Sequence, residues 1–272
     1  MKDVSIVIIN YNTFRLTCDC IKSILKQQVA VDYEIILVDN ASTEQDPDKF
    51  TELFPSVKLI KSDKNLGFSK GNNLGIKYAS GHTILLLNSD TELVSDSITL
   101  GFETLNRNQK IGVVTGQLVS PDGSIQNNCQ SFPSLTKKLV ENFRLQKIMP
   151  VALKSRYLKG HYFDYSTPGK PDWVWGTFFM FRKDLLSTFE NNKLPETYFM
   201  YLEDMEWCYE IRKKGFDIVY IPEIRVLHHL GGSGANAKRL IRENFNDFLN
   251  RNYLWPKSAL LKNRDQKNLN DE

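Results

Sequence analysis

Polar segments follow four apolar stretches in the first 90 residues of the chain, and three of the four carry carboxylates. The apolar stretches are residues 4–10, 34–39, 57–62 and 82–87, and the polar segments begin at residues 10, 39, 63 and 88. Carboxylate oxygens are the ligands that hard divalent cations prefer, and such cations bridge the oxygens of a diphosphate. The pattern predicts a polar cleft in which Asp90 is the candidate ligand of a Mg²⁺ or Mn²⁺ ion.

The chain lacks a glycine-rich motif for phosphate binding. Neither G-x-G-x-x-G nor G-x-x-x-x-G-K-[ST] occurs after any of the four stretches, so a dinucleotide site of the usual kind or a P-loop is not expected. A cation held by Asp90 at the end of a strand is therefore the candidate partner for a bound phosphate.

The elements that must position these residues alternate between strand and helix. Apolar runs predict strands over the four stretches and over 111–117, and helical spacing of apolar residues predicts helices over 13–28, 69–79 and 95–106. This order predicts a parallel, three-layer α/β sheet. Ligands bind at the carboxyl ends of strands in such sheets, so the polar segments are expected to share one edge.

The second half of the chain is expected to be more mixed. A basic segment over 136–159 is predicted to be partly helical, and residues 121–123 (Pro-Asp-Gly) predict a turn. Strands are predicted over 173–181, 216–222 and 224–228, and helices over 202–214 and 237–254, the second of them after a glycine loop at 231–234.

The composition limits the class of protein. The chain has 272 residues, of which 41% are hydrophobic and 25% charged, and this excludes a disordered or fibrous protein. Its four cysteines are too few for a disulfide scaffold and lack the spacing of a zinc site. Because no stretch approaches 18 apolar residues and no signal peptide precedes the first predicted strand, we expect a cytoplasmic protein.

Six segments of the sequence resemble an inverting family 2 glycosyltransferase of the GT-A fold, and they are most similar to its rhamnosyltransferase-like branch. The segments are VSIVIINYN at 4–12, VDNAS at 38–42, NLGFSKGNN at 65–73, LNSDT at 87–91, WG at 175–176 and YFMYLED at 198–204. The match runs in order over residues 4 to 234, which makes it more specific than any single motif.

The resemblance implies a Rossmann-like, mostly parallel central sheet flanked by helices, with a smaller mixed subregion on the acceptor side and a C-terminal helix. It divides a GT-A domain at residues 1–234 into a nucleotide-sugar-binding half, 1–117, and an acceptor and catalytic-base half, 118–234. Residues 235–272 then form a basic amphipathic C-terminal tail.

The resemblance also implies a nucleoside-diphosphate sugar donor, with dTDP-L-rhamnose favoured over a UDP-sugar. Tyr11 would line the nucleobase pocket, and Asp39 would accept a hydrogen bond from the base; simple packing of Tyr11 and a turn-capping role for Asp39 are the alternatives. The residues carried over as donor contacts are Asn10, Tyr11, Asn12, Asp39, Asn40, Asn65, Gly67, Phe68, Gly71, Asn72, Asn88, Ser89 and Asp90.

By the same resemblance Asp90 is the last residue of a D-x-D pattern that commonly reads Asn-Pro-Asp in this branch. Here the pattern is Asn88-Ser89-Asp90, and we expect the missing proline to loosen the turn but to leave the metal-binding carboxylate in place. A late histidine can complete the metal shell, which makes His228 the second expected ligand and His229 the alternative. Paired histidines in a turn more often only pack or face solvent.

The resemblance makes Asp204 the base that takes the proton from the acceptor hydroxyl, with Glu203 orienting the acceptor or metal-bound waters. An isolated Glu-Asp pair would more simply be two acids that the helix dipole favours. Trp175 and Gly176 are carried over as an acceptor or sugar wall, because aromatic rings suit the apolar faces of sugars; core packing is the alternative for Trp175.

A glycan or lipid-linked intermediate of cell-surface polysaccharide synthesis is the implied acceptor, at the inner face of the cell membrane, and no nucleic-acid partner is expected. Two other functions stay open. A nucleotidyltransferase would share the sheet, metal and nucleotide, but residues 10–16 lack its usual glycine-rich loop and lysine. A non-catalytic nucleotide-sugar-binding scaffold would have no need of Asp90 and Asp204.

The excess positive charge is confined to the end of the chain. Residues 237–272 hold eight Lys and Arg and five Asp and Glu, and subtracting these from the totals of 35 and 32 leaves 27 of each. Basic residues interleaved with aromatics and leucines predict peripheral docking on anionic lipid, or else a helix that packs on the domain. A second basic cluster, 137–159, has seven Lys and Arg against Glu141 and is expected to face the acceptor.

Overall fold

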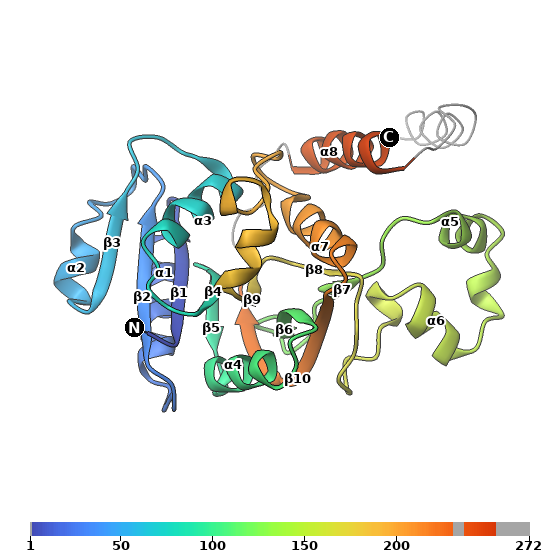
Figure 1. Cartoon of the computed structure of the whole chain (residues 1–272), viewed down its shortest axis with the longest axis horizontal. Helices are drawn as coiled ribbons and strands as arrows, with labels where there is room; N and C mark the ends of the chain where they lie inside the picture. Colours follow the sequence, from blue (N-terminus) through green and yellow to red (C-terminus); the bar gives the residue numbers. More distant parts are fainter. Residues whose placement is uncertain (1, 231–236, 254–272) are drawn as a thin grey trace.

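The computed structural model of the chain describes residues 2–230 and 237–253. Its centre is an eight-stranded sheet in the order β3-β2-β1-β4-β9-β6-β10-β5 (Figure 1). The strands are β1 (Val4–Asn10), β2 (Tyr33–Asp39), β3 (Val57–Lys61), β4 (Thr83–Asn88), β5 (Thr91–Leu93), β6 (Ile111–Val119), β9 (Phe178–Arg182) and β10 (Asp217–His228). Strands β9 and β5 run antiparallel to their neighbours, and the other pairs are parallel. The predicted α/β fold with a mostly parallel sheet is confirmed.

Helices cover both faces of this sheet, as the alternating sequence pattern predicted. One face packs against α1 (Phe14–Leu25), α2 (Lys49–Leu53) and α4 (Ser97–Arg107), and the other against α3 (Gly67–Lys77) and α7 (Glu203–Lys213). In the central strand β1, Ile6 and Val7 belong to the two different cores and are both fully buried. A strand that is buried on both faces needs a continuous apolar run, which is what residues 4–9 provide.

The aromatic strand predicted over 173–181 is wrong in its extent. The structure has two short strands there, β8 (Trp173–Val174), which pairs with β7 (Cys129–Gln130) in a separate two-stranded sheet, and β9 in the main sheet. Between them Gly176 donates its amide hydrogen to Asp204 Oδ2 (3.2 Å) instead of to a strand. The apolar run therefore belongs to two sheets, and the break places Trp175 and Gly176 at the edge of the large one.

The two strands predicted over 216–222 and 224–228 form one continuous strand, β10. Its register against β6 shifts between Ile221 and Arg225. Pro222 lies in this irregular stretch, and a proline has no amide hydrogen for a ladder, so the strand continues past it through a bulge.

The remaining differences are local. The short elements α2 and β5 were not predicted, and α1 ends at Leu25 instead of residue 28. Thr13 precedes α1 as expected but makes no capping bond through its side chain. Its amide instead donates to Asn10 Oδ1 (3.3 Å), and its hydroxyl lies 3.0 Å from that of Ser89.

The segment between β7 and β8 and the last described helix lie outside the layered core. The segment contains α5 (Leu135–Asn142), the 3₁₀ turn Leu145–Lys147, α6 (Val151–Tyr157) and the 3₁₀ turn Gly160–Tyr162, and it extends away from the main sheet (Figure 1). Helix α8 (Ala237–Asn252) packs beside α7, where Phe248 is fully buried. Within the described ranges no helix is long and apolar enough to cross a membrane.

The domain boundaries at residues 117 and 234 stay predictions. Strand β6 continues across residue 117, and strands from both proposed halves share one sheet. The predicted glycine loop at 231–234 and residues 254–272 of the predicted tail lie outside the described residues.

Candidate active site

The carboxyl ends of the parallel strands bring the polar segments together. In the sheet Asn10 pairs with Asp39, and Ile9 pairs with Asn88, so the ends of β1, β2 and β4 are adjacent. Strand β9 runs the other way and begins at this same edge, where the carbonyl of Thr177 accepts a hydrogen bond from the amide of Asn88 (3.0 Å).

A hollow of about 210 Å³ opens at this edge. Eight of the thirteen expected donor contacts line it: Tyr11, Asn40, Asn65, Gly67, Phe68, Asn88, Ser89 and Asp90. Four further lining residues, Ile9, Thr13, Leu87 and Met200, were not predicted as contacts. Tyr11 leaves 44% of its surface exposed, so its ring is available for stacking.

The other five expected donor contacts do not line this hollow. Asn10 and Asp39 are buried against each other, with Asn10 Nδ2 donating to Asp39 Oδ1 (2.8 Å). Asp39 Oδ2 also accepts from the amide of Ser42 (3.1 Å), which is the turn-capping role considered as the alternative. Asn12 accepts from the amide of Thr43 (2.8 Å).

Gly71 and Asn72 lie behind the wall of the hollow, on α3. A Cβ at Gly71 would stand 3.0 Å from the Ile9 side chain, so glycine lets α3 approach β1 closely. Asn72 is buried, and its Nδ2 donates to the carbonyl of Phe68 within the helix (3.1 Å).

Asn40 and Asn65 brace the loops after β2 and β3. Asn40 Nδ2 donates to Asn65 Oδ1 (3.0 Å), and Asn40 Oδ1 accepts from the amide of Leu66 (2.8 Å). Gly67 follows with φ of +74°, and a Cβ there would lie 2.2 Å from the carbonyl oxygen of Phe199, so only glycine fits. That same carbonyl accepts from the amide of Phe68 (2.9 Å), which ties the hollow to the loop before α7.

The structure distinguishes the two histidines. His228 Nε2 lies 3.4 Å from Asp90 Oδ1, whereas His229 Nε2 turns to Glu92 Oε1 (2.8 Å). Antiparallel pairing of β10 with β5 produces this difference, because it sets His228 opposite Thr91, the residue after Asp90.

Gln126 orients His228, and sequence reasoning missed it because an isolated glutamine carries no motif. Its Nε2 donates to the carbonyl of His228 (2.9 Å) and to Ser120 Oγ (3.0 Å), so its Oε1 faces His228 Nδ1 (2.7 Å). An amide oxygen can only accept. In the neutral ring Nδ1 therefore holds the proton, and the lone pair of Nε2 faces Asp90.

Asp204 lies at the same edge, on the first turn of α7. Its Oδ2 accepts from the amide of Gly176 and its Oδ1 from the amide of Met205 (2.8 Å). Gly176 is bonded to Thr177, whose carbonyl accepts from the amide of Asn88. Two hydrogen bonds and one peptide bond therefore join the Asp204 carboxylate to the Asn-Ser-Asp turn. A Cβ at Gly176 would lie 2.9 Å from the Phe68 ring, which explains the need for glycine between Phe68 and Asp204.

Burial changes the acidity of the Glu203-Asp204 pair. Burial raises the pKa of Asp204 to about 6, although hydrogen bonds from the amides of Met205 and Gly176 oppose the rise. Burial, and then the charge of Asp204, raise the pKa of Glu203 well above its usual range. Glu203 Oε2 is buried without a hydrogen-bond partner among the described residues. A carboxylate with a pKa near 6 is suited to accept a proton at neutral pH.

The family assignment follows from comparison with known proteins. Residues 5–189, more than half of the chain, match the profile of glycosyl transferase family 2. The chain belongs to this family. The predicted family is confirmed, which argues against the nucleotidyltransferase alternative.

Curated relatives of this family 2 glycosyltransferase share modest identity. An N-acetylglucosaminyl-diphospho-decaprenol L-rhamnosyltransferase of Mycobacterium tuberculosis is 23% identical over 210 residues, 72% of this chain and 66% of that protein. A low-salt glycan biosynthesis hexosyltransferase of Haloferax volcanii is 25% identical over 234 residues, 84% of this chain and 68% of that protein. The chain thus spans slightly less than two thirds of the mycobacterial relative.

Solved structures support the GT-A fold. S. aureus TarS is 15% identical, with a TM-score of 0.56 over 91% of this chain and 72% of that one. GalNAc-T7, solved with UDP, GalNAc and Mn²⁺, is 16% identical, with a TM-score of 0.59 over 91% of this chain and 50% of that one. At these identities the likeness concerns the fold alone.

The residues of this glycosyltransferase fit a divalent cation. Asp90 Oδ1 and His228 Nε2 face each other as two ligands of one ion would, and Asn88 Oδ1, which lines the hollow, is buried without a hydrogen-bond partner among the described residues. The described residues contain no group of three or more His, Cys, Asp or Glu side chains that could hold an ion. Diphosphate oxygens of a bound nucleotide-sugar and water molecules would therefore complete the coordination of a cation at this position.

The last described helix of the transferase supports the loop before Glu203. Tyr201 and Leu202 adopt φ values of +68° and +73°, which is strained for residues with a Cβ. Asn244 Nδ2 on α8 donates to the carbonyls of Met200 and Tyr201 (3.0 Å each) and so holds this strained backbone. No sequence signal pointed to Asn244, because its partners are backbone atoms more than 40 residues away.

Arg251, near the end of the same helix, fixes α8 to α7. Its Nη2 donates to Glu206 Oε1 (2.7 Å) and to the hydroxyl of Tyr198 (2.9 Å), and its Nε donates to Asp247 Oδ2 (2.9 Å). Over 237–252 the predicted tail therefore packs on the domain.

Trp175 has the packing role that was considered as the alternative for it. The ring packs against the core on the face of α1 and α4, and the side chain is only partly buried. Its use as an acceptor or sugar wall stays a prediction.

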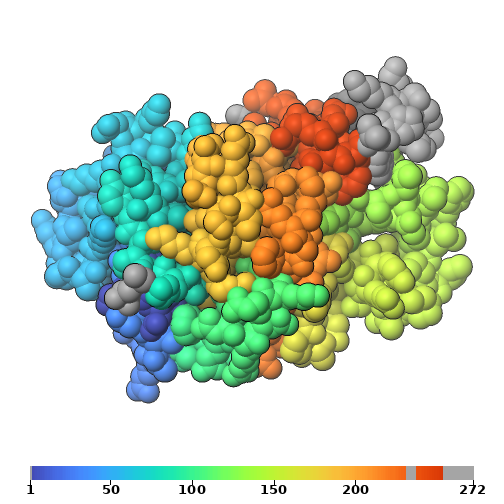
Figure 2. Space-filling model, viewed as in Figure 1, coloured from blue at the N-terminus to red at the C-terminus, as the bar shows by residue number. Residues whose placement is uncertain are grey.

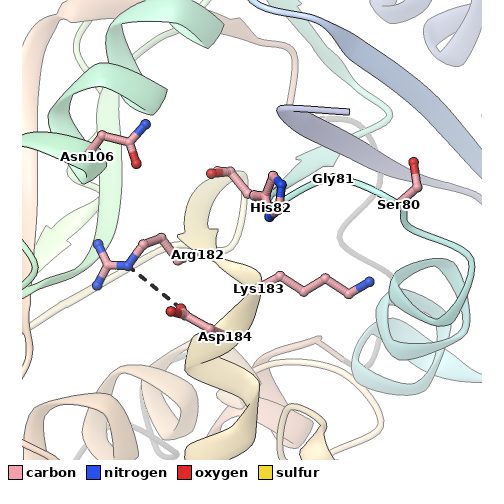
Figure 3. A pocket seen from close by; sticks show the side chains of 8 residues that line it. Ser80, Gly81, His82, Asn106, Arg182, Lys183 and Asp184 are labelled. Atoms are coloured by element: carbon pink, nitrogen blue, oxygen red, sulfur yellow. Dashed lines mark ion pairs between the residues drawn. The ribbon is translucent and has the colours of Figure 1, made fainter. Parts of the chain in front are cut away.

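A second and larger hollow, of about 820 Å³, lies at the opposite edge of the sheet (Figure 3). It is lined by Ser80, Gly81, His82, Thr83, Asn106, Arg182, Lys183 and Asp184, and none of these residues was predicted to act in catalysis.

Proposed function

We propose that this glycosyltransferase transfers a sugar from a nucleoside diphosphate to an acceptor hydroxyl in one displacement that inverts the anomeric carbon. The observation that carries the proposal is the link from Asp204 through Gly176 and Thr177 to Asn88. The link supports the proposal, because it connects the Asp204 carboxylate, with a pKa of about 6, to a residue that lines the hollow proposed for the donor.

Donor binding is proposed to use the loops after β1, β2 and β3. The exposed ring of Tyr11 would stack on the nucleobase, and Asn40 and Asn65, which brace their two loops, would shape the floor beneath the ribose. Asp39 accepts hydrogen bonds from Asn10 and from the amide of Ser42. We propose that it holds these loops in shape and contacts only the edge of the nucleobase.

A divalent cation, Mg²⁺ or Mn²⁺, is proposed to be held by Asp90 and His228, with Asn88 Oδ1 close by. When bound, such an ion neutralises the charge that the departing diphosphate acquires. Gln126 contributes by keeping the lone pair of His228 Nε2 directed at Asp90, as outer-shell partners of metal-ligating histidines do.

Asp204 is proposed to be the general base. The acceptor hydroxyl attacks the anomeric carbon and gives its proton to Asp204, a new carbon–oxygen bond forms, and the electron pair of the old bond leaves with the diphosphate. Glu203, whose pKa burial raises well above its usual range, is proposed to orient the acceptor or metal-bound waters. Gly176 aligns Asp204 through its amide.

Rhamnose is the favoured sugar, and a lipid-linked or glycan intermediate of polysaccharide synthesis at the inner face of the membrane is the favoured acceptor. Support comes from the mycobacterial relative, an L-rhamnosyltransferase that is 23% identical to this chain. UDP-sugars are the alternative donors.

The test is a panel of dTDP- and UDP-sugars with Mn²⁺, scored by the melting temperature of the full chain and by donor hydrolysis without acceptor. We expect one donor to raise the melting temperature and to be hydrolysed slowly, and Asp90→Ala to lose both effects. A chain that responds to none of the donors would contradict the proposal. A chain that binds a donor but never turns it over would instead be the non-catalytic scaffold.

A further inference from the structure

Large apolar side chains are exposed mainly in one part of the molecule. The described residues have 18 exposed large apolar side chains, and nine of them fall between residues 135 and 162: Leu135, Leu139, Phe143, Leu145, Ile148, Val151, Leu153, Tyr157 and Tyr162. Phe143, Ile148 and Val151 expose 71%, 82% and 77% of their surface. Exposed apolar side chains that are concentrated in this way in a folded protein indicate an interaction site.

The helices that carry this surface have no core of their own. Neither α5 nor α6, nor the 3₁₀ turn Leu145–Lys147 between them, contains a single buried residue. Helices of eight and seven residues are marginal without packing. In Figure 2 the segment forms a separate lobe at the side of the molecule, away from the sheet and its helices. Contact with a partner would supply the missing burial.

Contacts at the points where the lobe leaves and rejoins the domain hold it in place. Ser131 Oγ donates to the carbonyl of Leu158 (2.9 Å), and Lys159 forms an ion pair with Asp172. Changes at the tip of the lobe should therefore leave the rest of the fold intact.

The charge of the lobe identifies the kind of partner. Lys137 and Lys159 point inward, to Ser131 and Asp172. The lobe also carries Arg144, Lys147, Lys154 and Arg156, and its single acid is Glu141. A second copy of the chain would bring the same positive charge to the contact and be repelled. An anionic lipid surface satisfies both features, because it buries apolar tips and attracts basic residues.

We propose that residues 135–157 form a docking surface for an anionic lipid bilayer, with Phe143, Ile148 and Val151 entering the headgroup region. The surface differs from the predicted tail, because α8 is engaged with α7 through Phe248 and Arg251. The lobe returns to β8, which leads directly to Trp175 and Gly176, so docking would bring the acceptor side of the site toward the membrane. That last consequence rests on the proposed function; the docking itself does not.

The experiment is co-sedimentation of the full chain with vesicles, without donor or acceptor, so a failure of the proposed transferase reaction leaves the result readable. We expect binding to vesicles of equal parts phosphatidylcholine and phosphatidylglycerol, weak binding to phosphatidylcholine alone, and a loss of binding as salt is raised. The triple variant Phe143→Ser, Ile148→Ser, Val151→Ser should bind at least about tenfold more weakly.

Matched variants separate the effect of this surface from the effect of losing apolar side chains or positive charge anywhere on the molecule. Leu53→Ser with Val94→Ser removes two exposed apolar side chains elsewhere (57% and 56% exposed) and should bind like the wild type. Arg144→Glu, Lys147→Glu and Arg156→Glu should abolish binding to anionic vesicles, whereas reversal of the exposed Lys26, Lys77 and Lys110 should weaken it much less. If the melting temperature shows that the triple serine variant does not fold, the variant with Arg144→Glu, Lys147→Glu and Arg156→Glu tests the proposal in its place.

Three results would overturn the proposal: no binding of the wild type to anionic vesicles, equal binding of the triple serine variant, or equal losses in the Lys26, Lys77 and Lys110 control. A dimer in light scattering that the triple variant loses, together with no vesicle binding, would assign the surface to a second copy of the chain.

Discussion

The two hollows at opposite edges of the sheet differ in how many of their polar groups already make hydrogen bonds within the protein. The larger one, at the amino ends of the parallel strands, has two cations that are bonded to backbone: Arg182 donates to the carbonyls of Leu105 (3.0 Å) and Gln109 (2.9 Å), and Lys183 to that of Ala79 (2.6 Å). Arg182 Nε has no hydrogen bond within the described part of the chain, but Asp184 Oδ1 lies 3.7 Å away and balances its charge (Figure 3).

The smaller hollow, at the carboxyl ends, has polar groups that protein contacts leave incompletely used. Asn88 Oδ1 has no partner among the described residues, and His228 Nε2 faces Asp90 with its lone pair. Nearby, burial has raised the pKa of both Glu203 and Asp204. From this comparison we expect unsatisfied polar groups and perturbed acids to be better indicators of a catalytic site than the volume of a hollow.

The sharpest test of this contrast is Asp204→Asn, which keeps the shape of the side chain and removes the base. Transfer should fall by about 10²- to 10⁴-fold, the usual value of a general base, while donor binding by thermal shift is unchanged. Glu210→Gln on the same helix is the control and should retain activity. Wild-type turnover by the Asn variant would remove the base assignment.

The next effect concerns metal affinity. Gln126→Leu should weaken Mn²⁺ binding about 10- to 100-fold, because His228 Nδ1 loses its acceptor and the ring is then unconstrained. Titration of Mn²⁺ by electron paramagnetic resonance in the presence of nucleoside diphosphate measures this without turnover. Gln109→Leu, at the edge near the larger hollow, should bind Mn²⁺ normally; an unchanged affinity in the Gln126 variant would show that His228 needs no orienting partner.

A pH profile of the reaction tests the raised pKa of Asp204. Because the base must be unprotonated, kcat/KM should fall about tenfold per unit below a pH of about 6. The pKa of the folded state lies above the ordinary value of 3.8, so Asp204 costs stability once it ionises, and the cost appears as pH rises through about 6. Asp204→Asn should therefore melt at higher temperature than the wild type at pH 8 and equally at pH 4. A rate that is flat down to pH 5 would argue against Asp204 as the base.

A smaller loss is expected from Asn244→Ala on α8. The carbonyls of Met200 and Tyr201 lose their donor, the strained loop before Glu203 relaxes, and kcat should fall by about tenfold with donor affinity preserved. Asn246→Ala, exposed on the same helix, is the matched control. Equal activity of the two variants would show that α8 contributes stability alone.

The smallest effect on catalysis is expected from a substitution in the larger hollow. Arg182→Met leaves two carbonyls without a donor and should lower the melting temperature by a few degrees, yet transfer should stay within about twofold of the wild type. If Arg182→Met lost as much transfer as Asp204→Asn at a temperature where the variant is folded, the larger hollow would have a role in catalysis.

Much of this architecture could be predicted because its signals are local. Continuous apolar runs such as residues 4–9 define strands buried on both faces, and polar residues at their carboxyl ends, Asn10, Asp39 and Asn88, locate the edge where ligands bind. The extent of the aromatic stretch at 173–181 was wrong because an apolar run does not reveal which of two sheets each part will join.

The sequence by itself determined the family, the layered α/β fold and the edge on which the candidate residues meet, because periodicity and strand ends are properties of short segments. Tertiary structure alone decided which histidine faces Asp90, that Asp39 is engaged by Asn10, and that Asn244 and Gln126 support the site. It also decided that burial gives Asp204 a pKa near 6. These features depend on contacts between residues far apart in the chain, and no local pattern encodes the dielectric around a side chain or the partner that faces it.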